Sequence, residues 1–174
     1  PDTILQGLIG HPFVCPDMIY GGDWGAFMDD KGVDEELFIR SAQCSALLPM
    51  MQFSLSPWRK LSEDALKLVV DAGKLHKKMA PEIIELVNRS TVTGDPIVRN
   101  LEYNYPNSSY ENVIDQFLLG DDILVAPVVT KGATSRKVVF PDGKWQGPDG
   151  AVYEKGIHEV DAPISVLPWF RRIK

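Results

Sequence analysis

DQFLLGDDILVAPV, residues 115–128, is the stretch that decides the fold of the second half of this chain. Two short runs rich in apolar residues, Phe117–Leu119 and Ile123–Val129, flank the tripeptide Gly120-Asp121-Asp122. Apolar residues such as phenylalanine, isoleucine and valine favour strands, whereas glycine and aspartate favour tight turns. The pattern therefore predicts two short strands separated by a turn.

The same alternation continues on both sides of this stretch, from Pro96 onward. Further strand-like runs are Ile97–Tyr105, Arg136–Phe140, Ala151–Tyr153 and Ile164–Phe170, and turn formers stand at Lys131-Gly132, Pro141–Lys144 and Pro148–Gly150. Many short strands at close spacing with turn signals between them predict an antiparallel β-sandwich.

Before Gly94 the pattern differs, because helical and strand-like segments alternate. We expect the end of a helix at 2–9, a buried strand at 11–18 entering a glycine-rich loop, a helix at 34–43, a strand within 46–53, and a long helix over 62–87 that Pro81 kinks or splits. This alternation predicts a parallel sheet covered by helices. A domain junction is expected near Thr93–Pro96.

Composition excludes several function classes. The net charge of −6, from 18 basic and 24 acidic residues, argues against a surface that binds nucleic acid or an anionic membrane. The longest apolar run is too short to span a bilayer, so no membrane contact is expected from this segment. Because the sequence opens at Pro1 without Met and stops directly after an apolar run, we expect a fragment of a longer protein.

The two cysteines, Cys15 and Cys44, form no CxxC motif, and no histidine stands at metal-ligand spacing from them. No metal site and no cofactor are therefore expected, and two buried thiols are favoured over a disulfide. Asn88 and Asn107 each begin an N-glycosylation triplet, NRS and NSS. Glycosylation at either residue requires passage through the secretory pathway.

Several motifs, taken in order, resemble glycoside hydrolase family 31. They are Asp17 followed by Gly21-Gly22, Glu36–Gln43 (ELFIRSAQ), Pro96–Arg99 (PIVR), residues 115–128, and Pro141–Trp145 (PDGKW). The resemblance implies an α/β chain in which residues 1–94 are the last strand-helix units of a (β/α)8 TIM barrel. Residues 95–174 are then the truncated proximal C-terminal β-sandwich domain.

The sequences of residues 11–18 (HPFVCPDM) and of Gln52–Trp58 resemble those of the myogenesis-regulating branch of the family. Family members that act on α-glucosides mostly carry a histidine where this chain has Ser54. Its absence is compatible with an α-galactoside as substrate.

The resemblance implies a retaining exo-α-glycosidase that hydrolyses α-linked sugars such as α-galactosides or α-glucosides. Retaining hydrolysis uses two carboxyl groups roughly 5–5.5 Å apart. The family places both on earlier barrel strands, upstream of Pro1, so no catalytic residue is expected here and the isolated chain is expected to be inactive. The alternative is a glycosidase-like protein that binds carbohydrate or regulates without hydrolysis.

Three residues are candidates for substrate binding: Asp17, Ser54 and Trp58. Residues at the carboxyl ends of barrel strands face the active site, and Asp17 and Ser54 stand where predicted strands give way to loops. A carboxylate there accepts sugar hydroxyls, and Trp58 or Trp24 can stack on a sugar ring. The alternatives are a loop-capping acid at Asp17, a turn residue at Ser54 and a packing residue at Trp58.

Other polar residues are expected to be structural. Glu36, Arg40 and Gln43 on one helix predict a buried ion pair that braces the barrel, in preference to substrate contacts. Asp121 and Asp122 predict a turn in preference to a calcium site, because further oxygen ligands are lacking nearby. The sequence assigns no oligomeric state.

Overall fold

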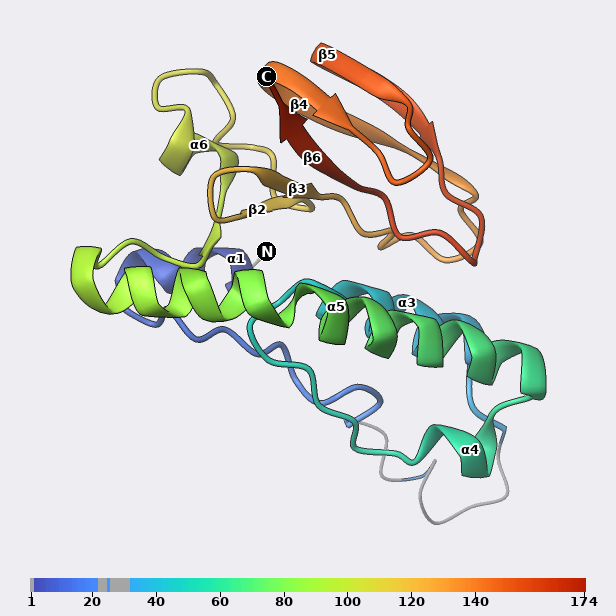
Figure 1. The fold of residues 1–174 in the computed structure, drawn as a ribbon. Coiled ribbons are helices and arrows are strands. Elements are labelled where there is room, and N and C mark those ends of the chain that lie inside the picture. The colour runs from blue at the N-terminus through green and yellow to red at the C-terminus, as the bar shows by residue number, and fades with distance from the viewer. Residues whose placement is uncertain (1, 22–24, 26–31) are drawn as a thin grey trace.

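A computed structural model describes residues 2–21, 25 and 32–174, and Figure 1 shows a helical half beside a sheet. The helices are α1 Asp2–Leu5, the 3-10 helix η1 Gln6–Ile9, α3 Glu35–Ala46, α4 Pro57–Lys60, α5 Glu63–Thr93 and α6 Leu101–Asn104. The strands are β1 Val98–Arg99, β2 Phe117–Leu119, β3 Ile123–Val125, β4 Ser135–Gln146, β5 Val152–Asp161 and β6 Trp169–Ile173.

The long helix α5 runs across the middle of the molecule, between the sheet and the segment that carries α4 (Figure 1). Its start is defined by Ser62, whose side chain accepts a hydrogen bond from the Ala65 amide, and acidic residues follow in the first turn. Its end is defined by Gly94, which adopts the left-handed conformation that caps helices. The helix continues through Pro81 without being split, and its apolar face packs against α3.

The two strands predicted in the first half are almost absent. Within 11–20 and 46–54 the only regular pairing is one parallel bridge between Ile19 and Phe53. Its hydrogen bonds run from the Ile19 amide to Gln52 O, 2.8 Å, and from the Ser54 amide to Ile19 O, 3.1 Å. Prolines at three positions of these segments remove backbone donors, and an isolated strand pair is marginal. Apart from Ala46, which ends α3, the rest of both segments is irregular.

The second half contains a sheet of order β1-β2-β3-β6-β4-β5, with every pair antiparallel. The predicted strands in 117–119 and 123–129 are confirmed as the β2–β3 hairpin, although β3 ends at Val125. The chain is therefore a mixed α/β structure with an antiparallel sheet, as the turn-rich pattern indicates.

The boundaries of three elements were predicted wrongly. The run 97–105 holds only β1, because the Asn100 side chain accepts a hydrogen bond from the Tyr103 amide and so starts α6. Residues 141–144 do not end a strand. Instead β4 continues through them with a shift of register between Phe140 and Lys144. The run 164–170 enters a strand only at Trp169.

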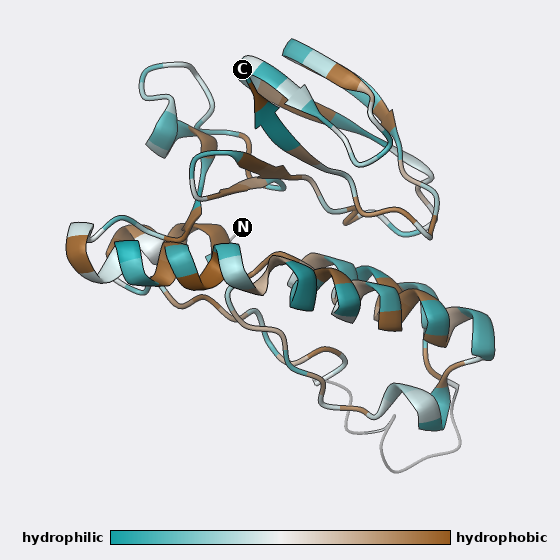
Figure 2. Ribbon diagram, viewed as in Figure 1, coloured by the Kyte–Doolittle hydropathy of each residue, from teal (hydrophilic) through white to brown (hydrophobic). Residues whose placement is uncertain are grey.

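The β2–β3 hairpin is shared by two hydrophobic cores. Alternate residues of a strand point to opposite faces. Phe117, Leu119, Ile123 and Val125 therefore join the core formed with α3 and α5, whereas Leu118 and Leu124 join a second core with β4, β5 and β6. Figure 2 shows the hairpin as strongly hydrophobic. This arrangement fixes the sheet to the helical half.

Candidate functional site

Asp17 begins a tight turn next to the parallel bridge. One carboxylate oxygen of Asp17 accepts a hydrogen bond from the Met18 amide, 2.8 Å, and the Gly21 amide donates to Met18 O, also 2.8 Å. Tyr20 occupies the left-handed region at φ 59°. That conformation is uncommon for a residue with a bulky side chain, so the surroundings must hold it in place.

Two contacts with α3 hold Tyr20. Its hydroxyl oxygen accepts a hydrogen bond from the Asp34 amide, 2.9 Å, and its ring stacks on Phe38 with 5.2 Å between centroids. Phe38 is fully buried, so this anchor belongs to the main core. The turn that carries Asp17 is thereby fixed to α3.

Asp17 lines a pocket of about 310 Å³, together with Tyr20, Gly21, Ser41 and Cys44. The carboxylate is exposed, and its second oxygen forms no hydrogen bond with any residue that the structure describes. One oxygen therefore fills the predicted capping role, and the other can accept a hydrogen bond from a hydroxyl group of a ligand.

The two cysteines are free thiols of intermediate exposure. Burial raises the pKa of Cys44 to about 11, so this thiol stays protonated at neutral pH. Burial, followed by the charge of Asp17, also raises the pKa of Cys15. Neither thiol has the lowered pKa of a nucleophile.

Ser54 and Trp58 line a second pocket of about 500 Å³, against α5. Trp58 is 71% exposed in the short helix α4, so its ring is not a packing element of the core. The other aromatic candidate, Trp24, lies outside the described residues. The parallel bridge places the segments of Asp17 and Ser54 side by side, but the three predicted binding residues do not share one pocket.

Arg40 has a different role from the one predicted. It is 7% exposed and donates four hydrogen bonds: to Gln43 Oε1, 2.9 Å, and to the carbonyl oxygens of Val166, 3.0 Å, Ala133, 3.2 Å, and Ala162, 2.8 Å. No carboxylate of the described residues lies within ion-pair distance of its guanidinium. Burial lowers the pKa of Arg40, in part opposed by the charge of Glu36. The predicted ion pair is therefore wrong, because backbone carbonyls take the place of the carboxylate.

The other two residues of this motif also reach the sheet domain. Glu36 accepts a hydrogen bond from the Gly132 amide, 2.5 Å, and Gln43 donates to Ile164 O, 2.8 Å. We call Glu36, Arg40 and Gln43 the α3 clamp. It joins α3 to the loops before β4 and β6, and α3 in turn carries the anchor of the Asp17 turn. The regular spacing of three polar residues on one helix was the sequence signal, but their partners lie more than 90 positions away.

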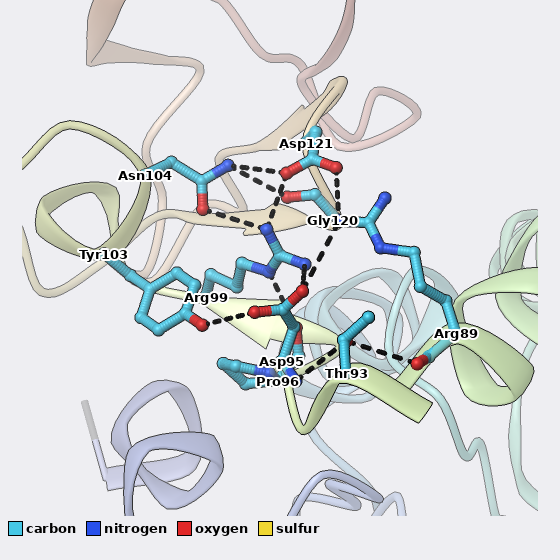
Figure 3. Close-up of polar contacts among 9 residues, drawn as sticks. All are labelled: Arg89, Thr93, Asp95, Pro96, Arg99, Tyr103, Asn104, Gly120 and Asp121. Carbon is cyan, nitrogen blue, oxygen red and sulfur yellow. Dashed lines mark hydrogen bonds and ion pairs between the residues drawn. The ribbon is translucent and has the colours of Figure 1, made fainter. Parts of the chain in front are cut away.

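A second polar cluster joins the end of α5 to the sheet (Figure 3). Arg99 on β1 is 4% exposed and donates to Pro96 O, 2.7 Å, Asn104 Oδ1, 3.2 Å, and Asp121 Oδ1, 2.6 Å. Arg89 on α5 contacts the other oxygen of Asp121, also at 2.6 Å. Asp121 thus bridges a helix and a strand.

The electrostatics of Asp121 follow from this bridge. Desolvation by itself raises its pKa, but the hydrogen bond from Arg89 and the charges of Arg99 and Arg89 outweigh that effect, so the pKa is lowered. The prediction that Gly120–Asp122 forms a turn is confirmed. Among residues 2–21, 25 and 32–174 there is no cluster of three or more His, Cys, Asp or Glu residues that could hold a metal ion.

The predicted glycosylation residues lie in different settings. Asn88 is exposed on α5, and Asn107 is exposed in the loop after α6.

Within the described part of the chain, no helix has both the length and the apolar character needed to cross a membrane.

Comparisons with known proteins place this geometry in a family. Residues 94–173 match the glycosyl hydrolase family 31 C-terminal domain. Mouse myogenesis-regulating glycosidase is 37% identical over 172 residues, which is 95% of this chain and 24% of that protein. The chain spans about a quarter of the length of the curated relatives it matches.

Solved structures agree with this assignment. A GH31 α-xylosidase from a soil metagenome, complexed with xylose, superposes with a TM-score of 0.83 at 26% identity, covering 98% of this chain and 29% of that one. The Flavobacterium johnsoniae GH31 dextranase, complexed with glucose, gives a TM-score of 0.84 at 27% identity, with coverage of 98% and 22%. The chain belongs to glycoside hydrolase family 31.

Proposed function

We propose that these residues belong to a retaining exo-α-glycosidase and form one wall of its sugar pocket. The observation that supports this most is the exposed carboxylate of Asp17, which lines a pocket beside a turn anchored to α3 and has one oxygen without a hydrogen bond to any residue that the structure describes. The family membership supports the reaction class, because related enzymes hydrolyse α-linked sugars.

Within this proposal, residues 1–94 contribute the last strand-helix units of a (β/α)8 barrel and residues 95–174 its neighbouring β-sandwich. The parallel bridge between Ile19 and Phe53 supports this assignment, since barrel strands run parallel. Asp17 and Ser54 then lie at the carboxyl ends of adjacent strands.

The chemistry needs two carboxylates about 5–5.5 Å apart, one as nucleophile and one as acid and then base. We assign both to the part of the protein outside these 174 residues. Asp17 instead accepts sugar hydroxyls and so orients the sugar relative to that pair. Accordingly, the 174 residues alone are expected to show no hydrolysis.

Ser54 and Trp58 extend the site in the proposal. Trp58 offers an exposed aromatic face of the kind that stacks on sugar rings. Ser54 is smaller than the histidine common in α-glucoside-specific members, which suits an α-galactoside. Passage of the protein through the secretory pathway is the last part of the proposal. It is supported by the similarity of the chain to mouse lysosomal alpha-glucosidase.

The test uses the complete protein on nitrophenyl α-galactoside and α-glucoside. Asp17→Asn should lower kcat/KM by about 10- to 100-fold, the loss expected when a hydrogen bond to a charged acceptor is weakened. Asp64→Asn, which removes an exposed carboxylate of α5, is the matched control and should have no effect. Equal activity of both variants would rule out the role of Asp17.

A non-catalytic carbohydrate-binding or regulatory protein is the second candidate, and Ser54 is the observation that favours it. The upstream sequence separates the two candidates. If the natural upstream sequence lacks either of the two catalytic carboxyl groups, and the complete protein binds sugar in calorimetry without turnover, the binding role is established.

A further inference from the structure

The loop after α6 presents Asn107 to solvent. Its backbone is held by Glu102, whose two carboxylate oxygens accept hydrogen bonds from the amides of Asn107, 2.6 Å, and Tyr110, 3.0 Å. The rings of Tyr105 and Tyr110 meet edge to face at the base of the loop, 6.3 Å between centroids. The loop is therefore ordered, although it has no regular secondary structure.

The triplet Asn107-Ser108-Ser109 is fully accessible. All three residues are exposed, and both Asn107 and Ser109 adopt left-handed backbone conformations, at φ 60° and 62°. No hydrogen bond joins the Asn107 carboxamide to another described residue. Figure 1 shows this loop projecting beyond the sheet, away from α4. The asparagine and the serine hydroxyl of this triplet are therefore both open to solvent.

The triplet Asn88-Arg89-Ser90 is built differently, because it lies inside α5. At 3.6 residues per turn, positions two apart point about 200° away from each other. Asn88 therefore faces solvent whereas Ser90 is 8% exposed and faces the core. An enzyme that must contact the asparagine and the hydroxyl two residues later cannot reach both unless the helix unwinds.

Unwinding is opposed by local structure. The Thr91 hydroxyl donates a hydrogen bond to Asn88 O, 2.7 Å, and the Gly94 amide donates to Ser90 O, 2.9 Å, so both ends of the triplet are tied into the last turns of α5. Arg89, the middle residue of the triplet, is also engaged with Asp121. The loop triplet is also held, through the Asn107 amide that donates to Glu102, but this bond leaves the side chains of Asn107 and Ser109 exposed.

We infer that Asn107 is an N-glycosylation site and that Asn88 is not. The inference rests on the proposed passage through the secretory pathway. It goes further, because it selects one of two equivalent sequence triplets from their geometry. The glycan would lie on the sheet domain, away from the pocket of Asp17.

The test expresses the complete protein in human cells and treats it with peptide N-glycosidase in heavy-oxygen water. Mass spectrometry should find the conversion of asparagine to labelled aspartate at residue 107 and none at 88. Asn107→Gln and Ser109→Ala should each increase the gel mobility by the amount that corresponds to one glycan, whereas Asn88→Gln should leave the mobility unchanged. Because Asn107 lies outside the proposed site, its variant should keep the hydrolytic activity of the parent.

A second form carrying a cleavable signal peptide separates this inference from the proposed location. Modification of Asn107 only in that form would overturn the location and uphold the site. Entry into the secretory pathway with residue 107 unmodified, or with residue 88 modified, would overturn the inference itself.

Discussion

Replacing Arg40 by methionine tests whether the α3 clamp holds the two halves together. Methionine is shorter than arginine but has an unbranched stem and a similar volume, so the change removes the donors with little change in volume. Two of the four hydrogen bonds of Arg40 are fully buried, those to Gln43 and to Ala162 O. The carbonyls of Ala133 and Val166 are partly exposed and can be hydrated.

The expected loss follows from this division. A buried acceptor left without a donor costs about 1–3 kcal/mol, so the two buried acceptors together lose about 2–6 kcal/mol. Removing a buried cation that lacks a carboxylate partner offsets part of this. We expect a net loss of about 2–4 kcal/mol. Arg40→Lys should lie in between, because an ammonium cannot reproduce the planar fork.

Hydrogen exchange on the complete protein is the assay. Arg40→Met should accelerate exchange in α3 and in the loops that contain Gly132 and Ile164, and should lower the thermal midpoint. Lys67→Met is the matched control, since it removes a cation from an exposed pair on α5. If both variants exchange and melt alike, the clamp does not stabilise the junction.

Three further predictions concern single residues. Gly120→Ala should destabilise the protein by about 1–2 kcal/mol because residue 120 has a left-handed conformation. The loss should exceed that of Gly132→Ala, because a Cβ at residue 120 would lie 2.6 Å from a leucine of α5 whereas a Cβ at residue 132 would meet nothing within 4 Å. Equal losses in the two variants would exclude the steric contribution at Gly120. In native protein at pH 8, iodoacetamide should modify Cys15 before Cys44, whose pKa of about 11 leaves almost no thiolate; faster labelling of Cys44 in peptide mapping would contradict its burial. The pKa of Asp121 is lowered in the folded state, so its stabilising effect is complete above the ordinary aspartate pKa and is lost as the pH falls through the folded value. Asp121→Asn should therefore flatten the acid side of the curve of unfolding free energy against pH. An unchanged curve would contradict the bridge formed by Asp121.

Local patterns predicted the elements whose stabilising contacts are close in sequence. The turn at Gly120–Asp122 and the acidic start of α3 depend on residues within a few positions, so composition and spacing were sufficient. Predictions were wrong where a local side chain competed with the expected strand. Asn100 ended β1 and started α6, and prolines interrupted the segment that holds Asp17.

The sequence by itself determined the family, the antiparallel character of the second half, and the three residues that we propose as binding the sugar. Only the tertiary structure decided the partners of Arg40, the bridge formed by Asp121, and the difference between Asn88 and Asn107. The physical reason is the separation of the interacting groups along the chain. Contacts of Arg40 join positions 93 to 126 residues apart, and such distances carry no local periodicity that a sequence pattern could reveal.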